Sequence, residues 1–419
     1  MDKIIVKGGN TLNGEVKISS AKNSVLPIIA ASILSGNKCI IDNAPMLEDV
    51  FVISDVLRSV SADIDIDKTS NKIIIDTSDI CDYEPCSELV KKLRASFLIM
   101  GPMISRFGKF IISLPGGCNI GTRPIDLHLK GFNALGAEVS VGYGYVEAKA
   151  KKLIGNKIYL DFPSVGATEN IMMAAVMAEG ETIIENAAEE PEIEDLAKFL
   201  NSMGANVIGG GTDTVRVLGV KNLKGAVHKP IYDRIEAGTF MVAAAITKSK
   251  IKVCGVNEEH LKPIIAKLTE MGVVIEVEGE SLTVDGTGIL KPIDIKTMPY
   301  PGFPTDMQAQ MMGLLSSVKG TSVITETIFE NRFMHASEMK RMGANIKIDG
   351  RSAVIEGIDR LTGCEVKSTD LRAGAALILC GLAAAGTTEV TDVYHIDRGY
   401  VNIEKKLQGL GANIYRECY

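Results

Sequence analysis

One short pattern recurs six times along this chain of 419 residues. In each copy an amphipathic stretch ends in a small residue, usually glycine, and an alternating polar and apolar stretch follows. The third residue of the pattern falls at Ala62, Ala137, Ala205, Val273, Ala344 and Ala412, so the copies are 75, 68, 68, 71 and 68 residues apart. A step this regular indicates a repeat architecture, in which each unit buries its apolar face against its neighbours.

The residues of the pattern predict helices, turns and strands in a fixed order. Glycine at its centre suits a helix C-terminus, where a left-handed residue caps the last turn. The strand that follows alternates, as at 346–348, and a turn at Gly350 then leads to a second strand at 353–356. A strand at 181–186 and a helix at 193–200 precede the third copy. We therefore expect each repeat to be a βαβαββ unit.

Strongly apolar segments between these patterns predict buried helices, at 171–178, 240–247, 307–315 and 373–385. Because the strands alternate, each sheet should have one wet face, so we expect the sheets outside and these helices inside. Six repeats divide naturally into two domains of three, and the predicted fold class is α/β. The glycine run at 209–211 fits a hairpin turn better than a phosphate loop, because no helix start follows it.

Composition excludes several classes of protein. Hydrophobic residues make up 46% of the chain, which is enough to fold. The net charge is −7 and tryptophan is absent, which argues against a nucleic-acid partner. The longest apolar stretch, 373–386, is shorter than the roughly 20 residues of a membrane span. The eight cysteines form no C-x-x-C pair, which favours reduced thiols. We expect a cytoplasmic protein without a membrane partner, and a monomer, although the sequence does not fix the oligomeric state.

Several sequence motifs of known chemistry are absent. The chain has no G-x-x-x-x-G-K-[ST] loop, no G-x-G-x-x-G that opens a helix after a strand, and no G-x-S-x-G elbow. Its five histidines form no H-E-x-x-H motif and no pair four residues apart. We therefore expect neither a metal nor a cofactor.

The segment 114–126 breaks the local pattern most strongly. Three glycines and two prolines surround Cys118 and Arg123. A backbone so interrupted does not suit a core element, so we expect the thiol on a loop of the kind that closes over substrates. A thiol, whose pKa in solution is about 8.5, can exchange a proton near neutrality. A structural turn is the alternative interpretation.

Charged residues stand at the starts of other predicted helices. Thr305 or Asp306 begins an apolar helix, and an N-cap is the simpler interpretation there. Arg372 also precedes an apolar helix and cannot comfortably be buried without an anion. Lys22 opens a helix at 25–34, where a cation opposes the helix dipole unless an anion binds. For the cations, a surface salt bridge is the alternative.

The cations at these unusual places suggest a ligand class. They are Lys22, Arg94, Arg123, Arg372 and Arg398. Because the protein as a whole is acidic, they indicate local pockets for a strongly anionic ligand, and the planar guanidinium suits phosphate and carboxylate. The residues alone thus indicate a two-domain repeat protein that binds phosphorylated anions, with a loop thiol and one or two carboxylates as proton carriers.

These motifs resemble those of the enolpyruvyl transferase family, in the branch that acts on a sugar nucleotide. The resemblance covers essentially the whole chain and rests on Lys22-Asn23, 94–96, the Pro-Gly-Gly-Cys loop at 115–118, 123–127, 300–310, 330–333, 370–372 and 395–400. It implies transfer of the enolpyruvyl group of phosphoenolpyruvate to the 3-hydroxyl of UDP-N-acetylglucosamine, the first committed step of peptidoglycan synthesis. It also implies two inside-out α/β barrels, or α/β prisms, formed by 22–230 and by 1–21 together with 231–419.

The resemblance also implies residue roles. Cys118 would protonate the methylene carbon of phosphoenolpyruvate, and Asp306 would take the proton of the sugar hydroxyl. Asp370 is the second candidate base, and Arg372 would stabilise developing charge. Phosphate and carboxylate would be held by Lys22, Arg123 and Arg398. The sugar nucleotide would be bound by Lys22, Asn23, Arg94, Arg123, Pro124, Ile125, Asp126, Leu127, Ser164, Val165, Asp306, Ile328 and Arg332.

Two other functions compete with this hypothesis. The shikimate-pathway enolpyruvyl transferase shares the architecture but uses shikimate 3-phosphate as acceptor, and the Pro-Gly-Gly-Cys loop with Arg123-Pro124 favours the sugar nucleotide. A non-catalytic sugar-nucleotide sensor on the same scaffold is the other alternative. The presence of Cys118, Asp306 and Arg398 argues against it.

Overall fold

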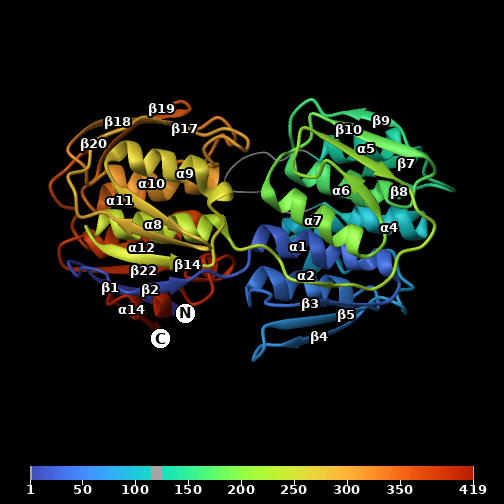
Figure 1. The fold of residues 1–419 in the computed structure, drawn as a ribbon, viewed down its shortest axis with the longest axis horizontal. Helices are drawn as coiled ribbons and strands as arrows, with labels where there is room; N and C mark the ends of the chain where they lie inside the picture. Colours follow the sequence, from blue (N-terminus) through green and yellow to red (C-terminus); the bar gives the residue numbers. More distant parts are fainter. Residues whose placement is uncertain (1, 115–124, 419) are drawn as a thin grey trace. The chain divides into compact units, whose positions relative to one another are not determined.

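The structure is a computed structural model that describes residues 2–114 and 125–418. These residues form two compact units (Figure 1). The N-terminal unit contains 20–114 and 125–231, and the C-terminal unit contains 2–19 and 232–418.

Three sheets belong to the N-terminal unit, in the orders β13-β3-β5-β4, β6-β8-β7 and β11-β12-β10-β9. Their strands are β3 (Lys38–Ile41), β4 (Asp63–Asp67), β5 (Lys72–Asp76), β6 (Lys109–Ser113), β7 (Glu138–Gly142), β8 (Tyr145–Lys149), β9 (Lys157–Tyr159), β10 (Glu181–Glu185), β11 (Asn206–Ile208), β12 (Thr214–Leu218) and β13 (Val227–His228). The glycine run at 209–211 joins β11 to β12, so the predicted hairpin turn is confirmed.

Three sheets also belong to the C-terminal unit, in the orders β21-β22-β1-β23, β15-β16-β14-β2 and β17-β18-β20-β19. Their strands are β1 (Asp2–Lys7), β2 (Glu15–Lys17), β14 (Lys250–Cys254), β15 (Val274–Glu278), β16 (Ser281–Asp285), β17 (Ile295–Lys296), β18 (Gly320–Thr325), β19 (Asn345–Asp349), β20 (Ser352–Gly357), β21 (Glu365–Lys367), β22 (Thr387–Thr391) and β23 (Asn413–Cys418).

The four-stranded sheets share one order of parallel and antiparallel pairs, whereas the described strands β6, β8 and β7 pair only antiparallel. Strand β14 pairs in parallel with β2 and antiparallel with β16, and β15 and β16 form a hairpin. The sheet of β18 repeats this arrangement with β17, β20 and β19. Exposed and buried residues alternate along strands such as β12 and β20, so their sheets have one wet face as predicted.

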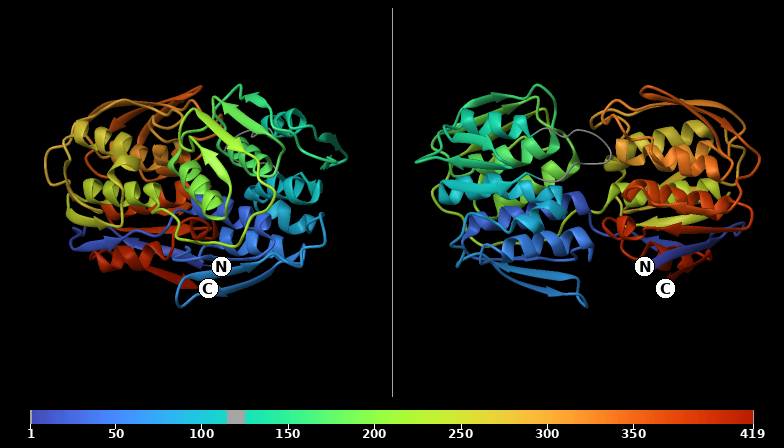
Figure 2. Two further views of the ribbon diagram at one scale, coloured as in Figure 1. Left: turned by 45° about the vertical axis from the view of Figure 1, so that its right-hand side comes forward. Right: turned by 180° about the vertical axis from the view of Figure 1, so that it is seen from behind.

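Apolar helices fill the interior of each unit. In the C-terminal unit α8 (Arg234–Ile246), α10 (Gln308–Leu315) and α12 (Leu371–Ala383) pack against one another and are almost wholly buried. In the N-terminal unit α1 (Lys22–Ala31), α4 (Met100–Phe107) and α6 (Val165–Ala175) are the main buried helices, extended by the 3-10 helices η1 (Ser32–Ser35) and η2 (Arg94–Ile99). Figures 1 and 2 show the sheets around these helices within each unit.

The remaining helices are amphipathic or short. They are α2 (Glu48–Arg58), α3 (Ser87–Lys92), α5 (Asp126–Ala134), α7 (Pro191–Ser202), α9 (Glu258–Met271), η3 (Thr305–Met307), α11 (His335–Arg341), α13 (Tyr394–Asp397) and α14 (Ile403–Gly409). Six of them precede the repeated turn, whose central residue always has a positive φ, at Ser61, Gly136, Gly204, Gly272, Gly343 and Gly411. The predicted left-handed helix end is therefore confirmed in every copy, including the one in which serine replaces glycine.

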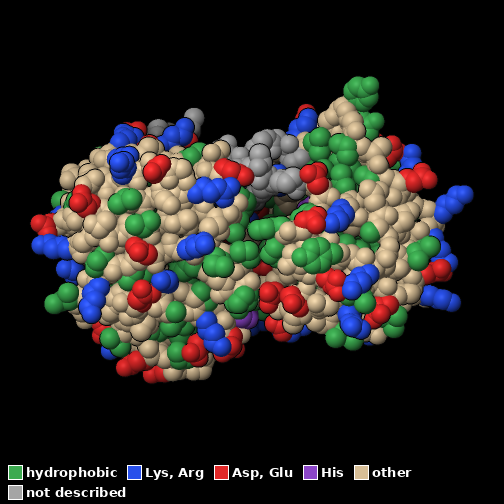
Figure 3. Space-filling view, turned by 90° about the horizontal axis from the view of Figure 1, so that it is seen from above, with side chains coloured by type: hydrophobic (Ala, Val, Ile, Leu, Met, Phe, Trp, Pro, Cys, Tyr) green, Lys and Arg blue, Asp and Glu red, His purple; other side chains and the backbone are tan. Residues whose placement is uncertain are grey.

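The lengths of the helices and the distribution of surface charge bear on possible partners. Within the described ranges, none of the helices combines the length and the apolar character that crossing a bilayer requires. Acidic and basic side chains are interspersed on the face shown in Figure 3 and do not gather into a basic stripe on it.

Candidate functional site

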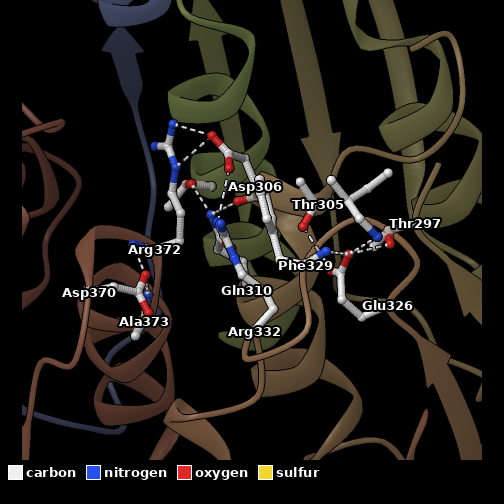
Figure 4. A network of polar contacts seen from close by, with 12 residues as sticks. Thr297, Thr305, Asp306, Gln310, Glu326, Phe329, Arg332, Asp370, Arg372 and Ala373 are labelled. Carbon is white, nitrogen blue, oxygen red and sulfur yellow. Dashed lines mark hydrogen bonds and ion pairs between the residues drawn. The ribbon is translucent and has the colours of Figure 1, made fainter. Parts of the chain in front are cut away.

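Asp306 lies at the centre of an ion-paired cluster in the C-terminal unit (Figure 4). Its Oδ1 accepts a hydrogen bond from Arg332 Nη2 at 2.9 Å. Its Oδ2 accepts from Arg372 Nη2 at 2.9 Å and from Nε at 3.2 Å. Both arginine side chains are only 4% exposed, whereas the Asp306 side chain is 26% exposed. The Asp306 carboxylate is thus held by two buried arginines, and part of its surface remains accessible to solvent.

The N-cap interpretation of Asp306 is wrong. The 3-10 helix η3 begins after Pro304 and has no side-chain cap, because the Asp306 carboxylate binds the two arginines instead. Asp370 is the residue that acts as a cap, since its Oδ1 accepts from the backbone N–H groups of Arg372 and Ala373. The prediction that Arg372 needs an anion is confirmed, and the anion is Asp306.

The electrostatics of Arg372 follow from its burial. Burial alone lowers the pKa of a guanidinium, but the Asp306 carboxylate and the Tyr400 phenolic oxygen outweigh that effect, so the pKa of Arg372 is raised. The group stays charged. Within the trio of Asp306, Arg332 and Arg372 one positive charge is in excess, which suits a ligand that carries phosphate or carboxylate.

A buried polar layer supports Asp306 from the helix side. Gln310 Nε2 donates to the Asp306 carbonyl oxygen at 2.9 Å, to Thr239 Oγ1 at 3.2 Å and to Tyr400 Oη at 3.3 Å. The Thr239 and Tyr400 hydroxyls lie 2.9 Å apart. Sequence analysis assigned no role to these three residues, although Gln310 and Tyr400 lie in the motifs of the family resemblance. The signal for Gln310 and Thr239 is a polar side chain inside an otherwise apolar buried helix.

His335 also adjoins this cluster and was not singled out from the sequence. It is 1% exposed, and burial lowers its pKa to about 4, with Arg332 adding to the shift and Asp370 opposing it. The imidazole is therefore neutral at pH 7. Arg398 follows α13 and lies near His395, whose pKa it lowers together with burial.

Lys22 and Asn23 begin α1 in the N-terminal unit. Lys22 is 9% exposed, and its Nζ lies 2.5 Å from Asp49 Oδ2. The anion that the sequence demanded for Lys22 is thus supplied by Asp49, which is itself buried at the start of α2. Asn23 is exposed.

A second group in the same unit surrounds His128. Its Nδ1 lies 2.9 Å from Asn170 Nδ2 on α6, and Arg94 at the start of η2 contributes to its electrostatics. Burial, with a smaller effect from Arg94, lowers the pKa of His128 to about 4. Gly166 is so close that an added Cβ would lie 3.2 Å from the imidazole Cε1. The starts of η2, α5 and α6 therefore lie near one another.

The other predicted site residues are distributed over both units. Ser164 caps α6 through Ala167, and Val165 begins that helix. Ile125 and Asp126 form the start of α5, followed by Leu127. Ile328 follows β18, and its backbone N–H donates to Glu326 at 2.8 Å. Cys118, Arg123 and Pro124 lie outside the described residues. In the described ranges, no group of three or more His, Cys, Asp or Glu side chains is arranged to hold a metal ion.

Comparison with known sequences identifies the family. Residues 6–407 match the family model of EPSP synthase (3-phosphoshikimate 1-carboxyvinyltransferase). The chain belongs to the enolpyruvyl transferase family. Among relatives, the UDP-N-acetylglucosamine 1-carboxyvinyltransferase 2 of Clostridium tetani is 80% identical and covers 99% of this chain and 100% of its own length. The UDP-N-acetylglucosamine 1-carboxyvinyltransferase 1 of Clostridium acetobutylicum is 68% identical over the same shares.

Solved structures agree on the fold of this enolpyruvyl transferase. The enolpyruvyl transferase NikO from Streptomyces tendae has a TM-score of 0.90 at 24% identity, covering 99% of this chain and 98% of its own. An EPSP synthase from Acinetobacter baumannii has a TM-score of 0.78 at 18% identity and covers all of both chains. The predicted α/β class is confirmed.

Proposed function

We propose that this chain transfers the enolpyruvyl group of phosphoenolpyruvate to the 3-hydroxyl of UDP-N-acetylglucosamine and releases phosphate. This reaction is the first committed step of peptidoglycan synthesis. The observation that carries the proposal is identity of 80% over the full length of a relative with that enzyme's name. The ion-paired Asp306 cluster supplies the chemistry, because it places an accessible carboxylate among buried cations.

We assign Asp306 as the base that receives the proton of the sugar 3-hydroxyl. Each carboxylate oxygen of Asp306 accepts a hydrogen bond from an arginine. The side chain is still partly exposed, so a hydroxyl can approach it from that side. Asp370 is less suited, since one of its oxygens caps α12. Arg332 and Arg372 then stabilise negative charge that develops nearby, at no cost of reorganisation because they are already fixed.

The remaining steps use residues named from the family resemblance. Cys118 gives its proton to the methylene carbon of phosphoenolpyruvate, which leaves the adjacent carbon electron-poor. The sugar oxygen attacks that carbon, and Asp306 takes the hydroxyl proton. Phosphate then leaves with the electron pair of its C–O bond and receives the proton held by Asp306. One methyl proton returns to the Cys118 thiolate, and its electron pair restores the double bond. Lys22, Arg123 and Arg398 hold the phosphate and carboxylate.

The decisive experiment compares two acceptors. Purified protein is supplied with phosphoenolpyruvate and either UDP-N-acetylglucosamine or shikimate 3-phosphate, and phosphate release is measured. We expect turnover with the sugar nucleotide alone. Turnover with shikimate 3-phosphate alone would replace this proposal by the shikimate-pathway reaction, and binding of the sugar nucleotide without turnover would indicate a sensor.

We also propose an organisation and a location for the protein. The functional domains are 22–230 and 1–21 with 231–419, each an inside-out α/β barrel of three βαβαββ repeats. The three sheets and buried central helices of each unit support this. Seven cysteines of the described part are free thiols, as is usual in the cytoplasm. We propose a cytoplasmic monomer.

A further inference from the structure

Glu326 is a buried carboxylate that lies immediately after β18 and is 1% exposed. Its Oε1 accepts hydrogen bonds from Thr297 Oγ1 and from the backbone N–H of Ile328, both at 2.8 Å, and from Phe329 N–H at 3.3 Å. Its Oε2 accepts from Thr305 Oγ1 at 2.8 Å. Four donors thus converge on one side chain, which Figure 4 shows beside the Asp306 cluster.

The donors come from three separate segments of the C-terminal unit. Thr297 directly follows the short strand β17, and its N–H donates to the carbonyl of Thr325, the last residue of β18, at 3.0 Å. Thr305 immediately precedes Asp306 in η3. Ile328 belongs to the loop after β18 that leads toward Arg332. Glu326 is therefore the point at which the base, the strand edge and the loop meet.

Thr305 and Asp306 need such a support. They belong to a 3-10 helix of only three residues, a conformation with weaker hydrogen-bond geometry than an α-helix. The Asp306 carboxylate is fixed by arginines, and its backbone carbonyl accepts from Gln310 on the helix side, but on the other side its position depends on the turn itself. A hydrogen bond from the adjacent Thr305 hydroxyl to a buried, immobile carboxylate holds that turn from the opposite side.

We propose that Glu326 is a positioning residue that couples the Asp306 turn to the 328–329 loop. The inference rests on the proposed function, in which Asp306 is the base and Ile328 contacts the sugar nucleotide. One carboxylate then sets the distance between the group that removes the hydroxyl proton and the loop that holds the same substrate. Misplacement of a reacting group by about 1 Å can reduce a rate about 100-fold.

The test uses two matched pairs of variants in the full chain. Glu326→Ala removes both acceptor oxygens and so all four hydrogen bonds. Glu326→Gln keeps an oxygen for the three donors of Oε1, and the Thr305 hydroxyl can turn to accept from the new amide. Thr305→Val removes one hydrogen bond, whereas Thr305→Ser keeps it. Phosphate release is measured as a function of each substrate, so that kcat and the two KM values are obtained separately.

We expect Glu326→Ala to lower kcat about 100-fold and to raise KM for UDP-N-acetylglucosamine about tenfold. The KM for phosphoenolpyruvate should stay within about twofold, because the hydrogen bonds of Glu326 go to Thr297, Thr305 and the 328–329 backbone, none of which is assigned to phosphoenolpyruvate. Glu326→Gln and Thr305→Ser should stay within about fivefold of the parent. Adding Thr305→Val to Glu326→Ala should not lower kcat further, because the hydrogen bond between the two side chains is already lost.

A purely structural role has a different signature. Ser249→Ala, which removes a buried hydroxyl that accepts from Leu12 N–H at 2.7 Å in the same unit, serves as the control for lost stability alone. Its Tm should fall without a change in kcat. The proposal is overturned if Glu326→Ala folds with unchanged kcat, or if both KM values rise together. If Glu326→Ala does not fold, the proposal is tested with Thr305→Val instead. A kcat of Thr305→Val equal to that of Thr305→Ser then refutes the coupling. An inactive parent protein refutes the proposed function instead.

Discussion

Asp306 and Asp370 are neighbours that differ in what their oxygens do, and substitution of each by asparagine separates their roles. In Asp306→Asn the new amide N–H groups face a guanidinium, so one buried arginine loses its acceptor. We expect kcat to fall about 100-fold or more and stability to fall by about 1–3 kcal/mol, discounted for the partial exposure of the pair. Steady-state kinetics and thermal unfolding measure both effects.

Asp370→Asn is the matched control, because asparagine caps a helix about as well as aspartate. We expect it to leave the Tm nearly unchanged and to reduce kcat far less than Asp306→Asn. The opposite ranking of the two kcat values would transfer the role of base to Asp370.

Cys118 is tested by its own conservative replacement. In Cys118→Ser the hydroxyl is a far weaker acid than the thiol, so proton donation to the methylene carbon should fail while the binding groups remain. We expect retained UDP-N-acetylglucosamine binding by calorimetry and a loss of at least about 100-fold in turnover. Cys86→Ser, which alters an exposed thiol, should keep full activity. Equal turnover of Cys118→Ser and the parent would remove Cys118 from the mechanism.

At the residue scale, sequence alone identified charges but not their partners. Arg372 in front of an apolar helix demanded an anion, yet Asp306 lies 66 residues away, and that pairing depends on how two repeats pack. The pairing of Lys22 with Asp49 depends in the same way on how α1 packs against α2 within one repeat. Glu326 was missed because a glutamate after a strand resembles any surface residue, and only its burial with four donors distinguishes it.

At the scale of elements, the repeated turn was predictable because it depends on local chemistry. Six copies place their central residue at positive φ, and in five of them it is glycine. The exception, Ser61, has a φ of 74°. A side chain in this left-handed region is strained, so the sequence itself offers a comparison between repeats.

Ser61→Gly should therefore stabilise the protein, by about 1 kcal/mol, because the strain outweighs the entropy of an added glycine. The reverse change in another repeat, Gly204→Ser, should destabilise it by about 1–2 kcal/mol. Gly204 has a φ of 105° and an added Cβ would meet no atom within 4 Å, so conformation is the only cause. Thermal unfolding measures both variants. Shifts of the same sign in the two variants would contradict this explanation.

For the whole molecule, each unit buries one neutral imidazole: His128 in the N-terminal unit and His335 in the C-terminal unit. Burial lowers the pKa of both to about 4, whereas an unfolded chain has histidines near 6.5. Between these values the unfolded state binds more protons than the folded state. Each histidine therefore contributes stability above pH 6.5 that is lost as the pH falls toward 4.

The free energy of unfolding should fall by on the order of 3 kcal/mol for each histidine, so both units should become less stable in acid. The buried carboxyls of Glu169 and Glu236 have raised pKa values, mainly through burial, and act in the opposite direction because the stability that they contribute is lost as the pH rises.

A single substitution isolates the histidine effect. In His335→Gln the Tm of the C-terminal unit, followed from pH 7 to pH 4.5, should fall less steeply than in the parent protein, whatever its value at pH 7. His128→Gln should do the same for the N-terminal unit. Parallel pH profiles for the parent and both variants would show that these two imidazoles do not set the acid sensitivity of the protein.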